Sequence, residues 1–193
     1  MDNYLNLLAK QVLGNTPDGL TKVKFAKILY FVYKGLVQKS FVTSQDLKFI
    51  RMPLGPVPVG FKDLSNDEEI KVSETHQLLS YDMQLYKLIG KSTYFEGEIS
   101  NTIQEIVTGL VRLPTSVLVD EAHKDPSWIN HKNGDEYYLT EEDLAIPLPL
   151  TQHAHVDQKE ESQHLQAKLV EGMLDEIVDE STFLEYPNSK LKE

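Results

Sequence analysis

Hydrophobic residues recur at helical spacing through the N-terminal part of the chain. In residues 2–13 the apolar positions fall three and four residues apart, as on one face of a short amphipathic helix. The turn-forming segment Asn15–Gly19 then interrupts this pattern. We expect a second helix over 22–38, capped by Thr21, with one apolar face. That face consists of Phe25, Ile28, Leu29, Val32 and Leu36.

The middle of the chain changes to a two-residue period. Residues 69–76 and 81–89 partly alternate polar with apolar side chains and are rich in β-forming residues, which predicts a β-hairpin. Residues 47–60, with three prolines and two glycines, predict a short strand followed by a stiff turn.

Helical spacing returns after the hairpin. We expect Ser100 to cap one helix and Pro114 to begin another that ends near His123. A short strand at Tyr137–Leu139 and an acidic helix beginning at Thr140 complete the pattern. The fold class is therefore predicted to be α+β and predominantly helical, with a small antiparallel sheet or β-hairpin.

The C-terminal part has a different character. We place one domain at 1–146, a proline-containing linker at 147–156, and an acidic amphipathic helix and tail at 157–193. The helix carries an apolar column that must be buried on its own domain, on a second copy of the chain, or in a groove of a partner. The column consists of Leu165, Leu169, Met173 and Ile177.

The composition of the chain indicates where the protein works and which kind of partner it binds. The chain has 193 residues, a net charge of −11 and no cysteine, so we expect a reducing, cytoplasmic location and no disulfides. No apolar run approaches the roughly 18 residues that a membrane span needs, and the N-terminus does not resemble a secretory signal. Acidic surfaces repel nucleic acid, which is therefore an unlikely partner. A protein with a basic surface is the expected partner.

One segment departs from this acidic character. Residues 19–45 hold five lysines and no acidic residue. On the 22–38 helix, Lys24, Lys27 and Lys34 fall on the side opposite the apolar face. A solvated outer face is the commoner explanation of such a basic stripe, and a binding site for an acidic partner or phosphate is the alternative.

Catalytic motifs find little support. Val117–His123 resembles a helicase metal motif and Gly90–Thr93 the end of a phosphate-binding loop, but Leu85 stands where such a loop needs glycine. Among the histidines, His153 and His155 have a spacing that allows shared metal ligation, although a polar, exposed linker explains them more simply. His123, Asp125 and His131 form either a cluster or a braced turn. We expect no catalytic residue, cofactor or metal.

Three segments, in this order, make the chain resemble the SocA-like, or Panacea-type, antitoxin family over about residues 3 to 145. They are Leu20–Phe31 (LTKVKFAKILYF), Leu54–Pro58 (LGPVP) and His123–Trp128 (HKDPSW). The matching positions are Lys24, Lys27, Leu29, Tyr30, Gly55, Pro56, Val57, His123, Pro126 and Trp128. A Gly-Pro turn and a large indole ring suit a scaffold, so we assign these residues a structural role first.

The resemblance implies a function. Members of this family neutralise toxins by direct binding, and some act as adaptors that deliver a toxin to a protease. We therefore expect an antitoxin with a cognate toxin as its partner and with possible self-association through the C-terminal helix. The alternatives are a protease adaptor, a phage or prophage regulatory interaction protein and, less favoured, a nucleotide- or metal-dependent enzyme. The expected contact surfaces are the basic stripe (Lys24, Lys27 and Lys34) and the apolar column of the C-terminal helix.

Overall fold

A computed structural model describes residues 4–76, 82–90, 94–150 and 163–169 of the chain. It confirms the predicted class: the fold is α+β and predominantly helical, with small antiparallel sheets. No helix in these described residues is long and apolar enough to cross a membrane.

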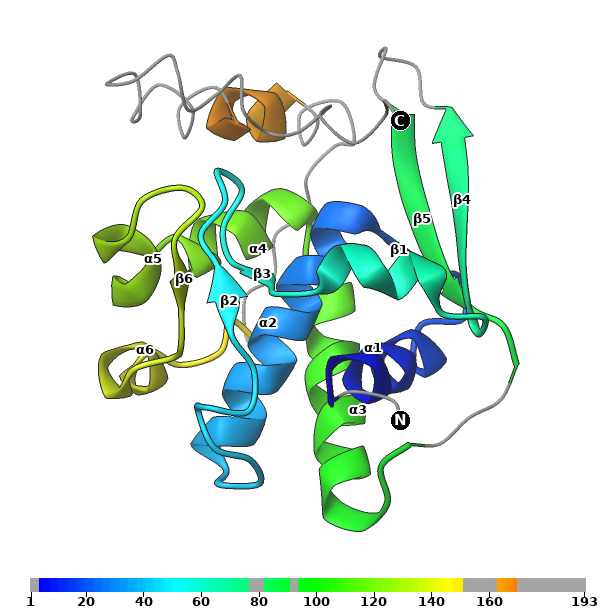
Figure 1. Cartoon of the computed structure of the whole chain (residues 1–193), viewed down its shortest axis with the longest axis horizontal. Coiled ribbons are helices and arrows are strands. Elements are labelled where there is room, and N and C mark those ends of the chain that lie inside the picture. Colours follow the sequence, from blue (N-terminus) through cyan, green and yellow to red (C-terminus); the bar gives the residue numbers. More distant parts are fainter. Residues whose placement is uncertain (1–3, 77–81, 91–93, 151–162, 170–193) are drawn as a thin grey trace, which may run out of the picture.

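Helix α2 (Lys22–Gln38) is the central element, and most of the other helices and both sheets pack around it (Figure 1). Its predicted bounds are confirmed, and its apolar face is buried as expected. Because neighbours cover it on several sides, burial extends beyond that face to Tyr33 and two lysines. The surrounding helices are α1 (Tyr4–Gly14), α3 (Gly97–Val111) and α4 (Thr115–Ala122).

The predicted hairpin is confirmed. Strands β4 (Ile70–His76) and β5 (Asp82–Leu88) pair antiparallel, and the short strand β1 (Leu20–Thr21) adds to the other edge of β5. Tyr86 of β5 turns into the core, where its ring lies 5.4 Å from that of Phe25. The hairpin is thereby fixed to the N-terminal half of α2.

A second sheet holds the proline-rich segment. Strand β2 (Phe49–Ile50) pairs with β3 (Val57–Pro58) on one side and with β6 (Glu136–Tyr137) on the other. Phe49 packs edge-on against Tyr30 of α2, with ring centroids 5.1 Å apart. The 3₁₀-helix η1 (Phe61–Asn66) then leads to the hairpin.

The side-chain capping predicted at Ser100 and Thr21 is not found at the starts of helices α3 and α2. Helix α3 begins at Gly97, so Ser100 lies in its first turn and is not its cap. Thr21 does stand at the N-cap of α2, but its side chain makes no capping hydrogen bond. The cap at Thr140 is confirmed, because Thr140 and Asp143 form a capping box at the start of α6 (Glu141–Ala145). Helix α5 (Pro126–Asn130) has its proline in the first turn.

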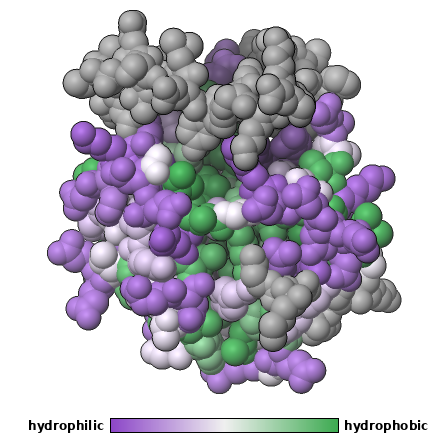
Figure 2. Space-filling model, viewed as in Figure 1, coloured by the Kyte–Doolittle hydropathy of each residue, from purple (hydrophilic) through white to green (hydrophobic). Residues whose placement is uncertain are grey.

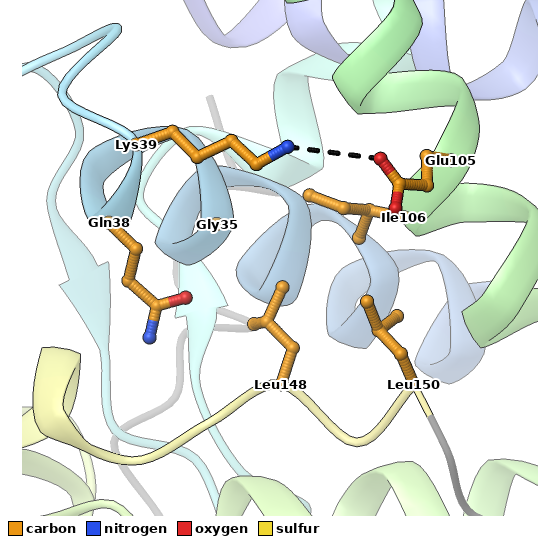
Figure 3. Close-up of a pocket in the computed structure, with 7 residues that line it drawn as sticks. All are labelled: Gly35, Gln38, Lys39, Glu105, Ile106, Leu148 and Leu150. Atoms are coloured by element: carbon orange, nitrogen blue, oxygen red, sulfur yellow. Dashed lines mark ion pairs between the residues drawn. The ribbon is translucent and has the colours of Figure 1, made fainter.

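The described part of the predicted linker packs against the domain. Leu148 and Leu150 enter a groove between α2 and α3, whereas residues 151–156 lie outside the described residues (Figure 3). Two helix glycines make room for this segment: a Cβ on Gly35 would lie 2.9 Å from Leu148, and one on Gly109 would lie 3.0 Å from Leu150. Just before this segment, the side chain of Gln38 donates hydrogen bonds to the carbonyls of Leu144 and Ile146.

Candidate functional site

The predicted basic stripe on α2 is not a surface. The side chains of Lys27 and Lys34 are 1% and 0% exposed, so the prediction that they contact a partner is wrong. Lys24 lies at the edge of the buried region and donates a hydrogen bond of 2.9 Å to the carbonyl of Val111. Helical periodicity predicts which side chains share a face, but α2 is covered on its polar side as well.

Lys34 is buried against a partner far away in sequence. Its ammonium lies 2.8 Å from both carboxylate oxygens of Asp125, directly before α5. Tyr30, one turn earlier on α2, donates its hydroxyl hydrogen to the same carboxylate. Burial raises the pKa of Asp125, and the attraction of Lys34 opposes that rise. The ion pair ties α2 to the start of α5.

Lys27 meets the Gly-Pro turn. Its ammonium donates a hydrogen bond to the carbonyl of Pro56, and burial lowers its pKa well below the usual value. Gly55 has a φ of +94°, and a Cβ there would lie 3.1 Å from the end of the Lys27 side chain. Glycine therefore suits this position for both its backbone conformation and its small size. Val57 follows in β3 and pairs with Ile50.

The Trp128 ring lies between two basic side chains. His123 stacks on it with ring centroids 3.8 Å apart and planes 10° apart, and the guanidinium carbon of Arg51 lies 4.2 Å from the ring centroid. The indole N–H donates to the carbonyl of Met52 at 3.0 Å. Burial, and after it Lys27, Lys168 and Arg51, lower the pKa of His123 to about 4. His123 is therefore neutral near pH 7.

The predicted cluster of His123, Asp125 and His131 does not form a common site. Asp125 faces Lys34, whereas His131 stacks on Tyr137 with ring centroids 4.8 Å apart. His123 follows α4 and stacks on Trp128. The alternative, a turn braced by a local hydrogen bond of His123, is not seen at its Nε2 atom, which is buried without a hydrogen-bond partner in the described part of the chain.

Two side chains of this region make contacts that the sequence did not predict. Arg51 belongs to none of the predicted sites, yet it covers one face of Trp128. Asp143 is fully buried: it accepts hydrogen bonds from the backbone N–H and the hydroxyl of Ser127, and thereby joins α6 to α5. The Thr140–Asp143 spacing signals the capping box, but no local pattern signals the contact with Ser127.

The nucleotide-site motifs lie in unsuitable elements. Residues 85–88 belong to the antiparallel strand β5, and Val117–Glu121 lie in helix α4. A phosphate-binding loop instead joins a parallel strand to a helix. Residues 91–93, His153 and His155 fall outside the described residues. Across the described ranges, no three His, Asp or Glu side chains gather as metal ligands would.

The C-terminal helix is described over 163–169 only. Leu165 and Leu169 are half-buried there, and Met173 and Ile177 lie outside the described residues. His164 and Lys168 both face Asp120 of α4, at 3.1 and 3.5 Å. This helix lies at the edge of the domain (Figure 1, orange).

Comparison with known proteins adds no relative. No family model, no curated protein and no solved structure matches this chain.

Proposed function

We propose that this chain is an antitoxin of a toxin–antitoxin system, and that it neutralises a partner toxin by direct protein–protein binding in the cytoplasm. The observation that carries the proposal is the meeting of the three segments on which the resemblance rests. Lys27 of the first segment binds Pro56 of the second. Tyr30 of the first also binds Asp125 of the third.

The contacts between these segments explain why they occur together. The first segment is joined to each of the other two by a buried polar side chain: Lys27 donates a hydrogen bond to the carbonyl of Pro56, and Tyr30 donates one to Asp125. If the three segments resembled the family only by chance, there would be no reason for them to contact one another in the fold. These contacts support a shared scaffold, and the net charge of −11 favours a protein partner with a basic surface.

The test is co-expression with the neighbouring reading frames. We expect one adjacent gene product to arrest growth alone, and this chain to restore growth and to elute with that product in size-exclusion chromatography. A control transcript with an early stop codon separates the protein's effect from that of its RNA. Absence of a toxic neighbour, or rescue without a complex, would contradict the proposal. A fall in the partner's half-life would indicate a protease adaptor instead.

A further inference from the structure

The carboxylate of Asp120 on α4 contacts two side chains of the helix at 163–169. The Nε2 atom of His164 lies 3.1 Å from Oδ2 of Asp120, and the Nζ atom of Lys168 lies 3.5 Å from Oδ1. His164 and Lys168 stand four residues apart, so they project from the same side of a helix. Asp120 therefore recognises a helix that carries two basic groups at this spacing.

The helix at 163–169 leaves one hydrogen-bond acceptor of the Asp120 carboxylate without a donor. The Oδ1 atom of Asp120 is shielded from solvent but accepts no hydrogen bond from the described part of the chain, because Lys168 reaches it only as an ion pair. The other oxygen contacts a histidine, which is charged only when protonated. A buried acceptor without a donor is unfavourable, so a better-placed lysine or arginine would bind more strongly.

The ion pairs that Asp120 makes with this helix are weak. The side chains of Asp120, His164 and Lys168 are 39%, 43% and 30% exposed, and ion pairs this exposed contribute little. Within the described residues, Leu165 and Leu169 are not among the side chains packed against the main core. A competing basic side chain can therefore replace His164 and Lys168 at Asp120 at little cost.

We propose that α4 carries a docking surface centred on Asp120 for a basic amphipathic helix of the partner protein, and that 163–169 occupies this surface in the free chain. The inference rests on the proposed function, since the toxin would supply the helix. The matching segment carries Lys or Arg at two positions four residues apart, with an apolar residue beside each. The net charge of −11 draws such a segment toward the chain.

A labelled peptide tests the surface. The probe is a fluorescein-labelled alanine- and leucine-based helical peptide with two lysines four residues apart, and binding to the full-length chain is measured by fluorescence anisotropy. The double variant His164→Ala/Lys168→Ala, which frees Asp120, is expected to bind about three- to tenfold tighter than the wild type. Asp120→Asn is expected to bind at least about threefold more weakly than the wild type.

The matched controls separate this surface from general charge attraction. Glu98→Gln makes the same charge change in the first turn of α3 and is expected to bind the peptide as the wild type does. A peptide with glutamine in place of both lysines is expected to lose the response. Equal affinity for the wild type and the double variant, or for Asp120→Asn and Glu98→Gln, would overturn the proposal.

Hydrogen exchange tests the same surface without any partner. Asp120→Asn is expected to speed amide exchange in 163–169 but not in α2, and unchanged exchange in 163–169 would overturn the proposal. The two proposals fail separately. If a toxin is neutralised equally well by Asp120→Asn, the docking surface is wrong and the antitoxin function stands. If no neighbouring gene product is toxic while the peptide results hold, the antitoxin function is wrong and the surface stands.

Discussion

Lys34 and Asp125 illustrate how much a single buried residue depends on its partner. Both side chains are almost fully shielded, and Tyr30 gives the carboxylate a further hydrogen bond. Burying two charges is costly, and their attraction in a medium of low polarity offsets that cost only while both are present. The pair therefore contributes more to the choice of one packing arrangement than to net stability.

Removing one partner of this pair is expected to be severe. Lys34→Met should lower the free energy of unfolding by about 3–5 kcal/mol, because it leaves Asp125 buried without its cation. Lys34→Met/Asp125→Leu should recover at least half of that loss. The matched control is Lys39→Met, whose side chain is half-exposed, and it should change stability by less than about 1 kcal/mol. Urea denaturation measures all three, and equal losses for Lys34→Met and Lys39→Met would refute the expectation.

His123 is expected to make stability depend on pH. Its pKa is about 4 in the folded chain against 6.5 in the unfolded chain, so between these values the unfolded state binds the proton more readily. Stability should therefore fall as the pH drops from 6.5 toward 4, and His123 adds no dependence above that range. Between pH 7.5 and 5 the loss should be about 1–2 kcal/mol. His123→Phe keeps a ring on Trp128 and should remove this component; an unchanged pH dependence would argue against it.

At the scale of the elements, the contact between α2 and α3 depends on a glycine. A Cβ on Gly35 would lie 2.5 Å from the Cδ1 atom of Ile106 and 2.9 Å from Leu148 (Figure 3). Ile106 is itself buried in the core, so it has little freedom to move aside. The close approach of the helices and the docking of 147–150 thus share one requirement for a small residue.

Gly35→Ala is expected to destabilise the fold in spite of helix propensity. Alanine gains about 1 kcal/mol over glycine inside a helix, but overpacking should outweigh that gain and leave a net loss of about 1–2 kcal/mol. Gly109→Ala in α3 is the matched control: its nearest atom lies at 3.0 Å on Leu150, so its loss should be less than half as large. Chemical denaturation of both variants decides this, and a more stable Gly35→Ala would contradict the packing argument.

At the scale of the whole molecule, the described structure has a packed domain and a peripheral helix. The domain extends to Leu150, because Leu148 and Leu150 pack against its core. Figure 2 shows hydrophilic residues on both sides of a band of hydrophobic ones on the face of Figure 1. The helix at 163–169 meets the domain through exposed ion pairs at Asp120.

Truncation separates these two parts. A chain ending at Leu150 should unfold within about 3 °C of the full chain, because the ion pairs at Asp120 contribute little. A chain ending at Ala145 should unfold roughly 5–10 °C lower, since it loses the apolar area that Leu148 and Leu150 bury. Thermal melts followed by circular dichroism make the comparison. Equal losses for both truncations would place the stabilising contacts beyond residue 150.

The sequence by itself determined the local elements. The bounds of α2, the β4–β5 hairpin and the cap at Thr140 follow from spacing, β-forming residues and capping chemistry, which act between near neighbours. The cap predicted at Ser100 failed because α3 begins earlier, at Gly97. The family resemblance also selected residues that join the three segments, including Lys27 and Tyr30, although local pattern did not reveal what they contact.

Only the tertiary structure decided where the charges lie. Periodicity placed Lys27 and Lys34 on the polar side of α2, but it cannot show that a helix is covered on that side too. The carboxylate that makes burial of Lys34 tolerable is Asp125, 91 residues away, and no local rule connects the two. The physical reason is that burying a charge depends on a partner brought close by the fold. The sequence thus determined the elements, and their packing decided that Lys27 and Lys34 of the basic stripe are buried.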